Sequence, residues 1–173
     1  MATVRVCRSV SGASGVHGRR MKKDVVVIGL GNPLMSDEGV GVELVRRLSC
    51  CESGYPGVEF IDGGTGGVSL IYRLGGRRKA VLIDCAYMGS EPGAIRRFTP
   101  DDVESKKVLS GRSLHEADLL KVLEMAKELG EAPGDVVIFG IEPEVVEPGM
   151  QLSAVLNNRL DHYVSVVERE LAG

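Results

Sequence analysis

Four short apolar runs, each followed at once by polar or glycine-rich residues, constrain the fold of this chain more than any other feature. Runs of this length, rich in Val, Ile and Leu and interrupted by a charge only at Glu59, are typical of strands buried on both faces, as in a parallel sheet. Between them lie segments whose apolar residues recur at the three- and four-residue spacing of an amphipathic helix. The predicted strands cover residues 25–30, 58–61, 80–83 and 136–141, with a further short one at 94–98. The predicted helices cover residues 37–48, 67–74, 114–129 and 152–171.

Strands that alternate with helices predict an α/β domain, here a three-layer α/β/α sandwich with a mostly parallel central sheet. The length of 173 residues suits one such domain, which we place at residues 24–173. In folds of this kind the ligand crevice lies outside the carboxyl ends of the strands. We therefore expect the polar residues that follow the strands to share one edge of the sheet, namely Asn32, Asp62, Asp84 and Glu142.

Residues 1–23 differ in composition from the rest of the chain, and we interpret them as a flexible basic leader. They are Ser- and Gly-rich and contain six of the 21 Lys and Arg residues but no acid. A transit peptide and a twin-arginine signal are two alternatives. Arg19-Arg20 is followed by Met-Lys-Lys-Asp and then by a predicted strand with a glycine in it, not by the apolar core of a signal peptide, which disfavours the second. We favour a flexible tail, either non-native or read from a start codon upstream of the natural one, because Met21 stands just before the first predicted strand.

Composition excludes several classes of protein. No apolar run approaches the roughly 20 residues that span a bilayer, so we expect no membrane insertion. Four cysteines without a C-x-x-C pair argue against a disulfide framework and structural zinc, and free thiols suit the cytoplasm. Outside the leader, 24 acids face 15 bases, which gives no basic stripe for nucleic acid. The basic triplet 77–79 is interpreted as a solvated turn before a strand.

Glycines after the first predicted strand invite a dinucleotide-binding interpretation. The G-x-G-x-x-G fingerprint needs a third glycine for close helix packing, and this chain has Leu34 there, after Pro33. Nucleotide binding is therefore disfavoured. We expect the glycines to permit a tight turn that brings Asp37 and Glu38 to the edge of the sheet.

Two carboxylates and one imidazole stand out as candidates for chemistry. Asp84 ends a buried strand, Glu38 lies where a helix begins, and His115 opens another helix, where the ring is favoured neutral and able to bind metal. Such a set suits a borderline divalent ion such as Ni, Zn, Co or Mn, which polarises a carbonyl or activates water. A Cys85 nucleophile is the alternative. The adjacent Asp84 charge would raise its pKa, so burial at the strand end is favoured.

Five segments of the chain, in order, resemble motifs of the nickel–iron hydrogenase maturation endopeptidases. The first is Gly29-Leu-Gly-Asn-Pro-Leu-Met-Ser-Asp-Glu-Gly-Val-Gly41 and the second Asp62-Gly-Gly-Thr-Gly-Gly67. The others are Ile83-Asp-Cys-Ala86, Ser113-Leu-His-Glu-Ala-Asp-Leu-Leu120 and Gly140-Ile-Glu-Pro143. The resemblance runs from about Val25 to Leu171 and implies a phosphorylase/hydrolase-like fold.

The resemblance implies an endopeptidase that removes the C-terminal extension of a hydrogenase large-subunit precursor after nickel insertion. Glu38, Asp84 and His115 match the residues that contact nickel in the family, and Asp62 matches a further acid that assists catalysis or shapes the turn. The implied nickel belongs to the substrate and serves as a recognition mark, although another divalent ion could occupy the site in vitro.

Where the family often has Gln, this chain has Glu142, which adds a charge near the site. Metal-activated water and carboxylate-assisted attack both remain open as the way in which the bond is broken. The alternative function is a non-catalytic metallochaperone or scaffold on the same fold.

Overall fold

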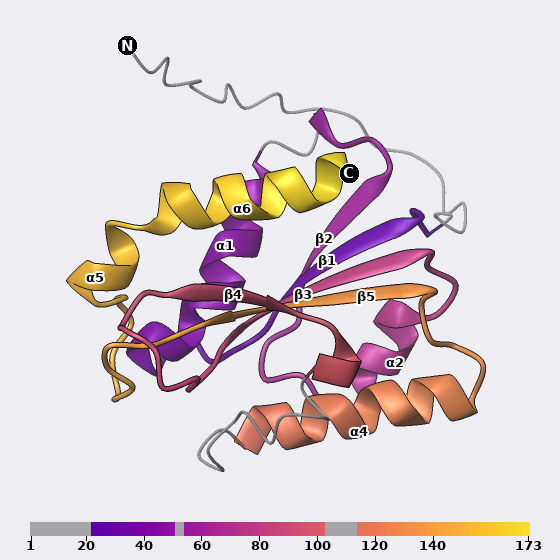
Figure 1. Ribbon diagram of the computed structural model, residues 1–173, viewed down its shortest axis with the longest axis horizontal. Coiled ribbons are helices and arrows are strands. Elements are labelled where there is room, and N and C mark those ends of the chain that lie inside the picture. Colours follow the sequence, from indigo (N-terminus) through magenta and orange to yellow (C-terminus); the bar gives the residue numbers. More distant parts are fainter. Residues whose placement is uncertain (1–21, 51–53, 103–113) are drawn as a thin grey trace, which may run out of the picture.

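The computed structural model describes residues 22–50, 54–102 and 114–173, the first five of the last range through their backbone alone (Figure 1). Within them, five strands form one sheet in the order β2-β1-β3-β5-β4. All neighbouring strands are parallel except β4, which is antiparallel to β5. The strands are β1 (Val25–Gly29), β2 (Val58–Asp62), β3 (Lys79–Cys85), β4 (Ile95–Phe98) and β5 (Asp135–Ile141).

Helices cover both faces of the sheet and make the three predicted layers (Figure 1). On one face lie α1 (Val40–Ser49), α5 (Ala154–Asn157) and α6 (Leu160–Ala172). On the other lie α2 (Ser69–Leu74) and α4 (Leu114–Glu128). Side chains along a strand alternate between the two faces. Accordingly Ala80 and Leu82 join the core beneath α2 and α4, while Val81 and Ile83 join the core beneath α1 and α6. The predicted fold class is confirmed.

Close backbone packing explains the glycines that follow β1. A Cβ atom on Gly29 would lie 2.0 Å from the Gly41 carbonyl oxygen, and one on Gly41 would lie 2.3 Å from the Ile83 oxygen. Gly31 has a φ of +124°, and a Cβ there would lie 1.8 Å from the Glu38 oxygen. The start of α1 is therefore pressed onto the ends of β1 and β3, as the predicted tight turn required, and the glycines need no nucleotide to account for them.

Two predicted helices differ from those in the structure. The helix predicted over 37–48 begins as a separate 3₁₀ turn, η1 (Ser36–Gly39), before α1. The closing helix is broken into α5 and α6 by a turn at Asn158 and Arg159. Asparagine is a poor helix former, and the break lets the Arg159 side chain donate to the Gly93 carbonyl at 3.1 Å. Apolar spacing continued across the break, so periodicity alone could not reveal it.

The basic triplet is not a solvated turn, and that interpretation was wrong. The Arg77 side chain is buried and donates to the carbonyls of Arg73 and Lys23 and to the carboxylate of Glu59. Lys79 is paired with Asp135 and Glu170. Only Arg78 of the three is exposed.

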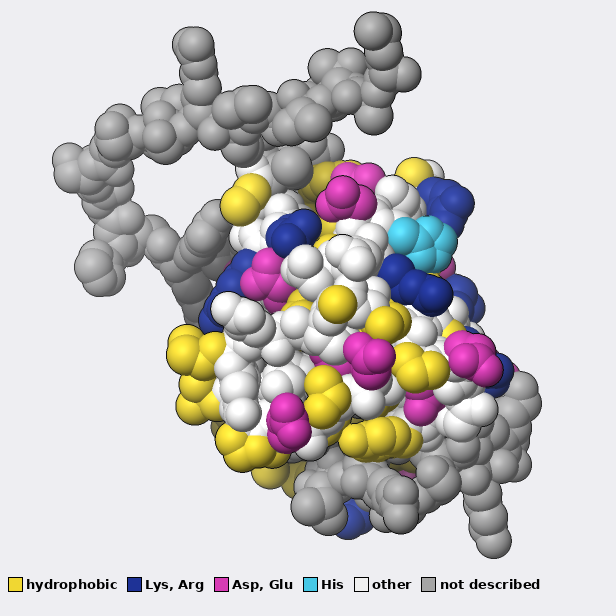
Figure 2. All heavy atoms as spheres, turned by 90° about the vertical axis from the view of Figure 1, so that its left-hand side faces the viewer, with side chains coloured by type: hydrophobic (Ala, Val, Ile, Leu, Met, Phe, Trp, Pro, Cys, Tyr) yellow, Lys and Arg dark blue, Asp and Glu magenta, His cyan; other side chains and the backbone are white. Residues whose placement is uncertain are grey.

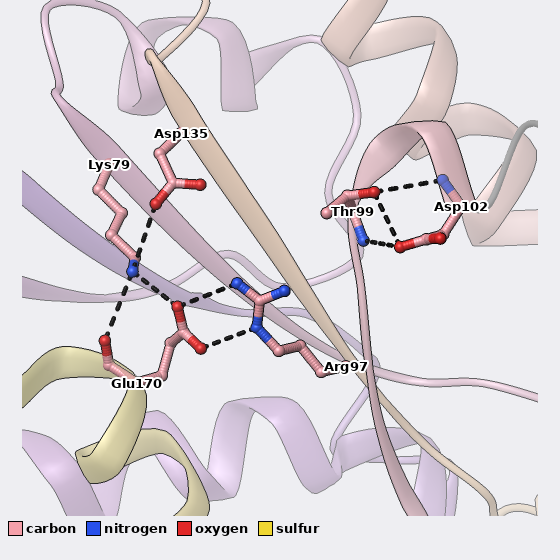
Figure 3. Close-up of polar contacts among 6 residues, drawn as sticks. All are labelled: Lys79, Arg97, Thr99, Asp102, Asp135 and Glu170. Carbon is pink, nitrogen blue, oxygen red and sulfur yellow. Dashed lines mark hydrogen bonds and ion pairs between the residues drawn. The ribbon is translucent and has the colours of Figure 1, made fainter. Parts of the chain in front are cut away.

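The end of α6 is anchored to the sheet by an ion-pair network (Figure 3). The Glu170 carboxylate accepts from Lys79 Nζ at 2.6 Å and from Arg97 Nε at 2.8 Å. These donors come from β3 and β4, which are not adjacent in the sheet. Nearby, the Asp102 carboxylate accepts from the backbone and hydroxyl of Thr99, closing the turn that follows β4.

The predicted leader, residues 1–23, lies outside the described residues except for its last two. Lys22 Nζ donates to the carbonyls of Tyr72 and Gly75, at the end of α2, and Lys23 Nζ donates to the Val58 carbonyl. No helix among the described residues has the length and apolar character needed to cross a membrane.

Candidate functional site

The candidate site lies at the carboxyl ends of the parallel strands, on the left of Figure 1, and Figure 2 shows that side face-on. Gly29, the last residue of β1, pairs with Asp62 on one side and with Ile83 on the other. Asp62 and Asp84 therefore lie on either side of the end of β1. This agrees with the prediction that polar residues after the strands share one edge of the sheet.

Asp84 is the penultimate residue of β3 and is buried, with 3% of its surface exposed. Its Oδ1 accepts from the backbone N–H of Cys85 at 2.9 Å, and Oδ2 is buried as well. Strand alternation places Asp84 on the same side of the sheet as Ala80 and Leu82, which is the side that α4 covers. A buried carboxylate at a ligand edge is a strong candidate for contact with a positively charged group.

His115 lies in the first turn of α4, and its side chain is outside the described residues. In Figure 1 α4 begins on the left, below the carboxyl ends of the strands, and runs away from them. The backbone thus brings this helix start to the same edge of the sheet, on the face to which Asp84 belongs. The role of His115 stays a prediction.

Glu38 is partly buried and lies within η1, which packs against the end of β3. The turn starts at Ser36, whose φ of 50° is uncommon for a residue with a side chain. That conformation is held by Ser36 N–H, which donates to the Gly149 carbonyl at 2.8 Å, and by Ser36 Oγ, which donates to the Glu147 carbonyl at 3.0 Å. The tight turn predicted from the glycines does deliver Glu38 to the edge.

Asp62 is the most exposed of the predicted site acids, with 44% of its side chain accessible. Its Oδ1 accepts from the Gly64 N–H at 3.0 Å, which closes the glycine-rich turn after β2. Its Oδ2 is paired with Arg46 of α1 at 3.2 Å. The carboxylate therefore shapes the turn, one of the two roles predicted for it.

Two further buried carboxylates hold the loops around the site. The Asp37 carboxylate accepts backbone N–H groups from Glu144, Val145 and Ser153, at 2.9, 3.0 and 2.7 Å. The Glu142 carboxylate accepts from Met88 at 2.6 Å and from Ser90 at 3.0 Å. Asp37 ties the turn that carries Glu38 to the loop after β5, and Glu142 ties down the loop after Asp84. The sequence singled out both acids, but nothing in it revealed these backbone partners.

Cys85, the alternative nucleophile, is buried with 6% of its surface exposed. It belongs to the core beneath α1 and α6, opposite the face to which Asp84 points. Burial at the strand end, which the sequence favoured, is confirmed.

Among the described side chains, no three His, Cys, Asp or Glu residues gather closely enough to hold a metal ion. The predicted nitrogen ligand, His115, is not among those side chains. The trio of Glu38, Asp84 and His115 therefore stays a prediction.

Comparison with known proteins decides the family. A model of the family described as "Hydrogenase maturation protease" matches residues 40–170. This chain belongs to that family. Asp62, Asp84 and His115 lie within the matched range, and Glu38 lies two residues before it. Membership confirms the resemblance expected from the five motifs and makes the chain a protease.

Individual members of the hydrogenase maturation protease family resemble this chain in sequence and in fold. The chain is 30% identical over 154 residues to hydrogenase expression/formation protein HupD of Thiocapsa roseopersicina, which covers 88% of this chain and 70% of the relative. The structure of this chain resembles the hydrogenase maturating endopeptidase HybD of Escherichia coli, with a TM-score of 0.74 and 25% sequence identity. The match covers 86% of this chain and 91% of HybD. It also resembles the hydrogenase 2 maturation peptidase of a Thaumarchaeota archaeon, with a TM-score of 0.65 and 30% sequence identity. That match covers 86% of this chain and 98% of the archaeal chain.

Proposed function

We propose that this protein is an endopeptidase that removes the C-terminal extension of the nickel–iron hydrogenase large-subunit precursor after nickel insertion. The observation that carries the proposal is the convergence of Glu38, Asp84 and the start of α4 on one edge of the sheet. These positions match the nickel-contacting residues that the family resemblance implies.

In this proposal the nickel arrives with the precursor and marks it as ready for cleavage. Two carboxylates and one imidazole suit a borderline divalent cation such as Ni²⁺. The carboxylate of Asp84 is buried at this edge, where its attraction to a cation is stronger than it would be in bulk water. A precursor that presents its metal to this edge therefore gains binding energy that an unloaded precursor lacks.

Asp37 and Glu142 support the chemistry through the backbone. Each fixes a loop that adjoins a candidate ligand, through hydrogen bonds between N–H groups and a carboxylate, which are stronger than those between neutral groups. Held in this way, Glu38 and Asp84 need little rearrangement to meet the nickel mark. We place the reaction in the cytoplasm, in keeping with the free thiols of the sequence.

The test is mass spectrometry of the precursor after incubation with the protein, with nickel-loaded and nickel-free precursor side by side. We expect loss of one C-terminal peptide from the loaded form alone. His115→Ala is expected to abolish the loss, because the proposed trio loses its only nitrogen donor. His162→Ala is the matched control, since His162 is exposed on α6.

Cleavage by His115→Ala at the wild-type rate would show that the site is wrongly assigned. A precursor that binds the protein in its loaded form but never loses mass would favour the metallochaperone alternative. Cys85→Ser is expected to cleave normally, and its failure would instead favour the thiol mechanism.

A further inference from the structure

Two large hydrophobic side chains lie exposed beside the candidate site. Among the described residues Leu34 is 60% exposed and Met150 is 81% exposed. They come from segments more than 100 residues apart in the chain, the turn after β1 and the loop after β5. Figure 2 shows that hydrophobic side chains do gather on this face of the molecule, with acidic side chains among them.

Backbone hydrogen bonds hold these two segments together. The Gly149 N–H donates to the Leu34 carbonyl at 2.9 Å, the Ser36 N–H donates to the Gly149 carbonyl at 2.8 Å, and Met35 and Gly149 form a parallel β-bridge. The same loop is tied to Asp37 by three further N–H groups. Leu34 and Met150 therefore stand on a braced backbone, and we call them the Leu34–Met150 patch.

A cavity of about 350 Å³ is lined by Met150 and by Pro33, the residue before Leu34. It has the volume of a small ligand site. Met150 and Leu152 contribute apolar wall, and Ser36, Gln151 and Asn157 contribute groups that can bond the backbone of an extended peptide. The charged residues of the wall, Glu43 and Arg46, are opposite in sign, so the cavity favours a neutral occupant over an ionic one.

The cavity adjoins the candidate site through residues of its wall. Ser36 and Gly39, the first and last residues of η1, both line it, and Glu38 lies between them in the chain. Arg46, on the opposite wall, holds the carboxylate of Asp62. A molecule that enters the cavity therefore lies next to the proposed cleavage site.

We propose that the Leu34–Met150 patch and this cavity bind a neutral apolar side chain of the precursor, close in sequence to the bond that is cleaved. The proposal rests on the function proposed above. The exposed apolar surface supplies the binding energy, and the braced backbone reduces the ordering cost on binding. Methionine adapts its shape to different apolar partners, which suits a surface that must accept a peptide and release it.

The test is the kinetics of cleavage of the nickel-loaded precursor, together with its dissociation constant. We expect Leu34→Ser and Met150→Ser each to raise KM and Kd about tenfold, which corresponds to the loss of part of one apolar contact. The kcat is expected to stay within about twofold, because neither residue belongs to the nickel-contacting trio. Met150→Leu keeps a large apolar side chain and is expected to have the KM, Kd and kcat of the wild type.

Leu129→Ser is the matched control. Leu129 is 64% exposed and follows α4, at the other end of the molecule from the patch. It should change neither KM nor Kd, and all variants should keep the wild-type Tm. Light scattering of the same variants addresses another occupant, a second copy of this chain.

Unchanged KM and Kd in both patch variants would overturn the proposal. A shift in oligomeric state with unchanged Kd would show instead that the patch is an interface between copies. If the wild-type protein binds the loaded precursor without cutting it, the proposed function fails, and the Kd values still decide whether the patch holds the precursor.

Discussion

Neighbouring aspartates at this edge of the sheet have different environments, and their hydrogen bonds distinguish their roles. Asp37 is fully buried, and three backbone N–H groups donate to its carboxylate. Asp62 is nearly half exposed and forms an ion pair with Arg46. Asp84 is buried, and its carboxylate accepts from the backbone N–H of the next residue, Cys85. Removing each carboxylate should therefore have a different consequence.

Asp37→Ala is expected to lower the free energy of unfolding by roughly 2–4 kcal/mol, because it leaves three buried N–H groups without their acceptor. Asp62→Ala is the matched control and should cost less than about 1 kcal/mol, since exposed ion pairs contribute little. Urea denaturation of both variants measures the difference. Equal losses would show that the Asp37 bonds do not brace the loop.

The sequence could locate the candidate acids but could not sort them. Asp62 and Asp84 follow apolar strands, so their shared edge followed from the rule for parallel sheets. Asp37 and Glu38 are adjacent, and the sequence singled out Glu38 for chemistry while giving Asp37 no role beyond a place at the same edge. The partners of Asp37 lie 107 to 116 residues further along the chain, and only the fold brings them together.

At the scale of elements, the closing helix depends on polar anchors as well as on its apolar face. Tyr163, Leu160 and Val167 are buried against the sheet. The Tyr163 hydroxyl donates to the Gly93 carbonyl at 2.8 Å, and burial raises the pKa of this tyrosine to about 12. At the other end of α6, Glu170 is paired with Lys79 and Arg97 (Figure 3). The helix is thus fixed at two points along its length.

The Glu170 anchor makes stability depend on pH in acid. The hydrogen bond from Arg97, and then that from Lys79, lower the pKa of Glu170 below its ordinary value of 4.5. A lowered pKa in the folded state adds stability above the unfolded pKa, and this is lost as the pH falls through the folded value. Wild type should therefore exceed Glu170→Gln in unfolding free energy at neutral pH, by a margin that shrinks below about pH 4.5.

Urea denaturation at neutral pH and at several acidic pH values measures this margin. Glu128→Gln, an exposed position near the end of α4, is the control and should show little difference from wild type at any of them. A margin for Glu170→Gln that stays constant into acid would contradict the role given to the ion pairs.

Element prediction succeeded where one physical signal dominated. Buried strands were found within two residues of their observed ends, because short runs rich in β-branched residues and closed by glycine or polar residues favour strands over helices. It failed at the turn between α5 and α6, because the apolar spacing continues across this turn. The Arg159 side chain there donates a hydrogen bond to the Gly93 carbonyl, which the apolar pattern does not reveal. It also failed for Arg77, whose charge suggested exposure although its partners bury it.

At the scale of the whole molecule, one sheet separates two apolar cores. One core joins the sheet to α2 and α4, and the other joins it to α1 and α6. Within the part of the chain that the structure describes, both cores are built from residues after position 24, and the single domain at residues 24–173 stays a prediction. The same arrangement leaves the carboxyl edge between the layers open to a ligand, as expected for this class of fold.

We predict that residues 1–20 of the leader are dispensable, and the last two residues of the leader allow a sharp test. A chain that begins at Met21 keeps Lys22 and Lys23, whose ammonium groups bond the carbonyls of Tyr72, Gly75 and Val58. We expect it to match the full chain in Tm and in precursor cleavage. A chain that begins at Asp24 loses these bonds and the Lys23 carbonyl that accepts from Arg77. Because Arg77 is buried, the unfolding free energy of the chain that begins at Asp24 should fall by roughly 1–3 kcal/mol. A loss of the same size in the longer chain would show that residues before Met21 contribute to the folded domain.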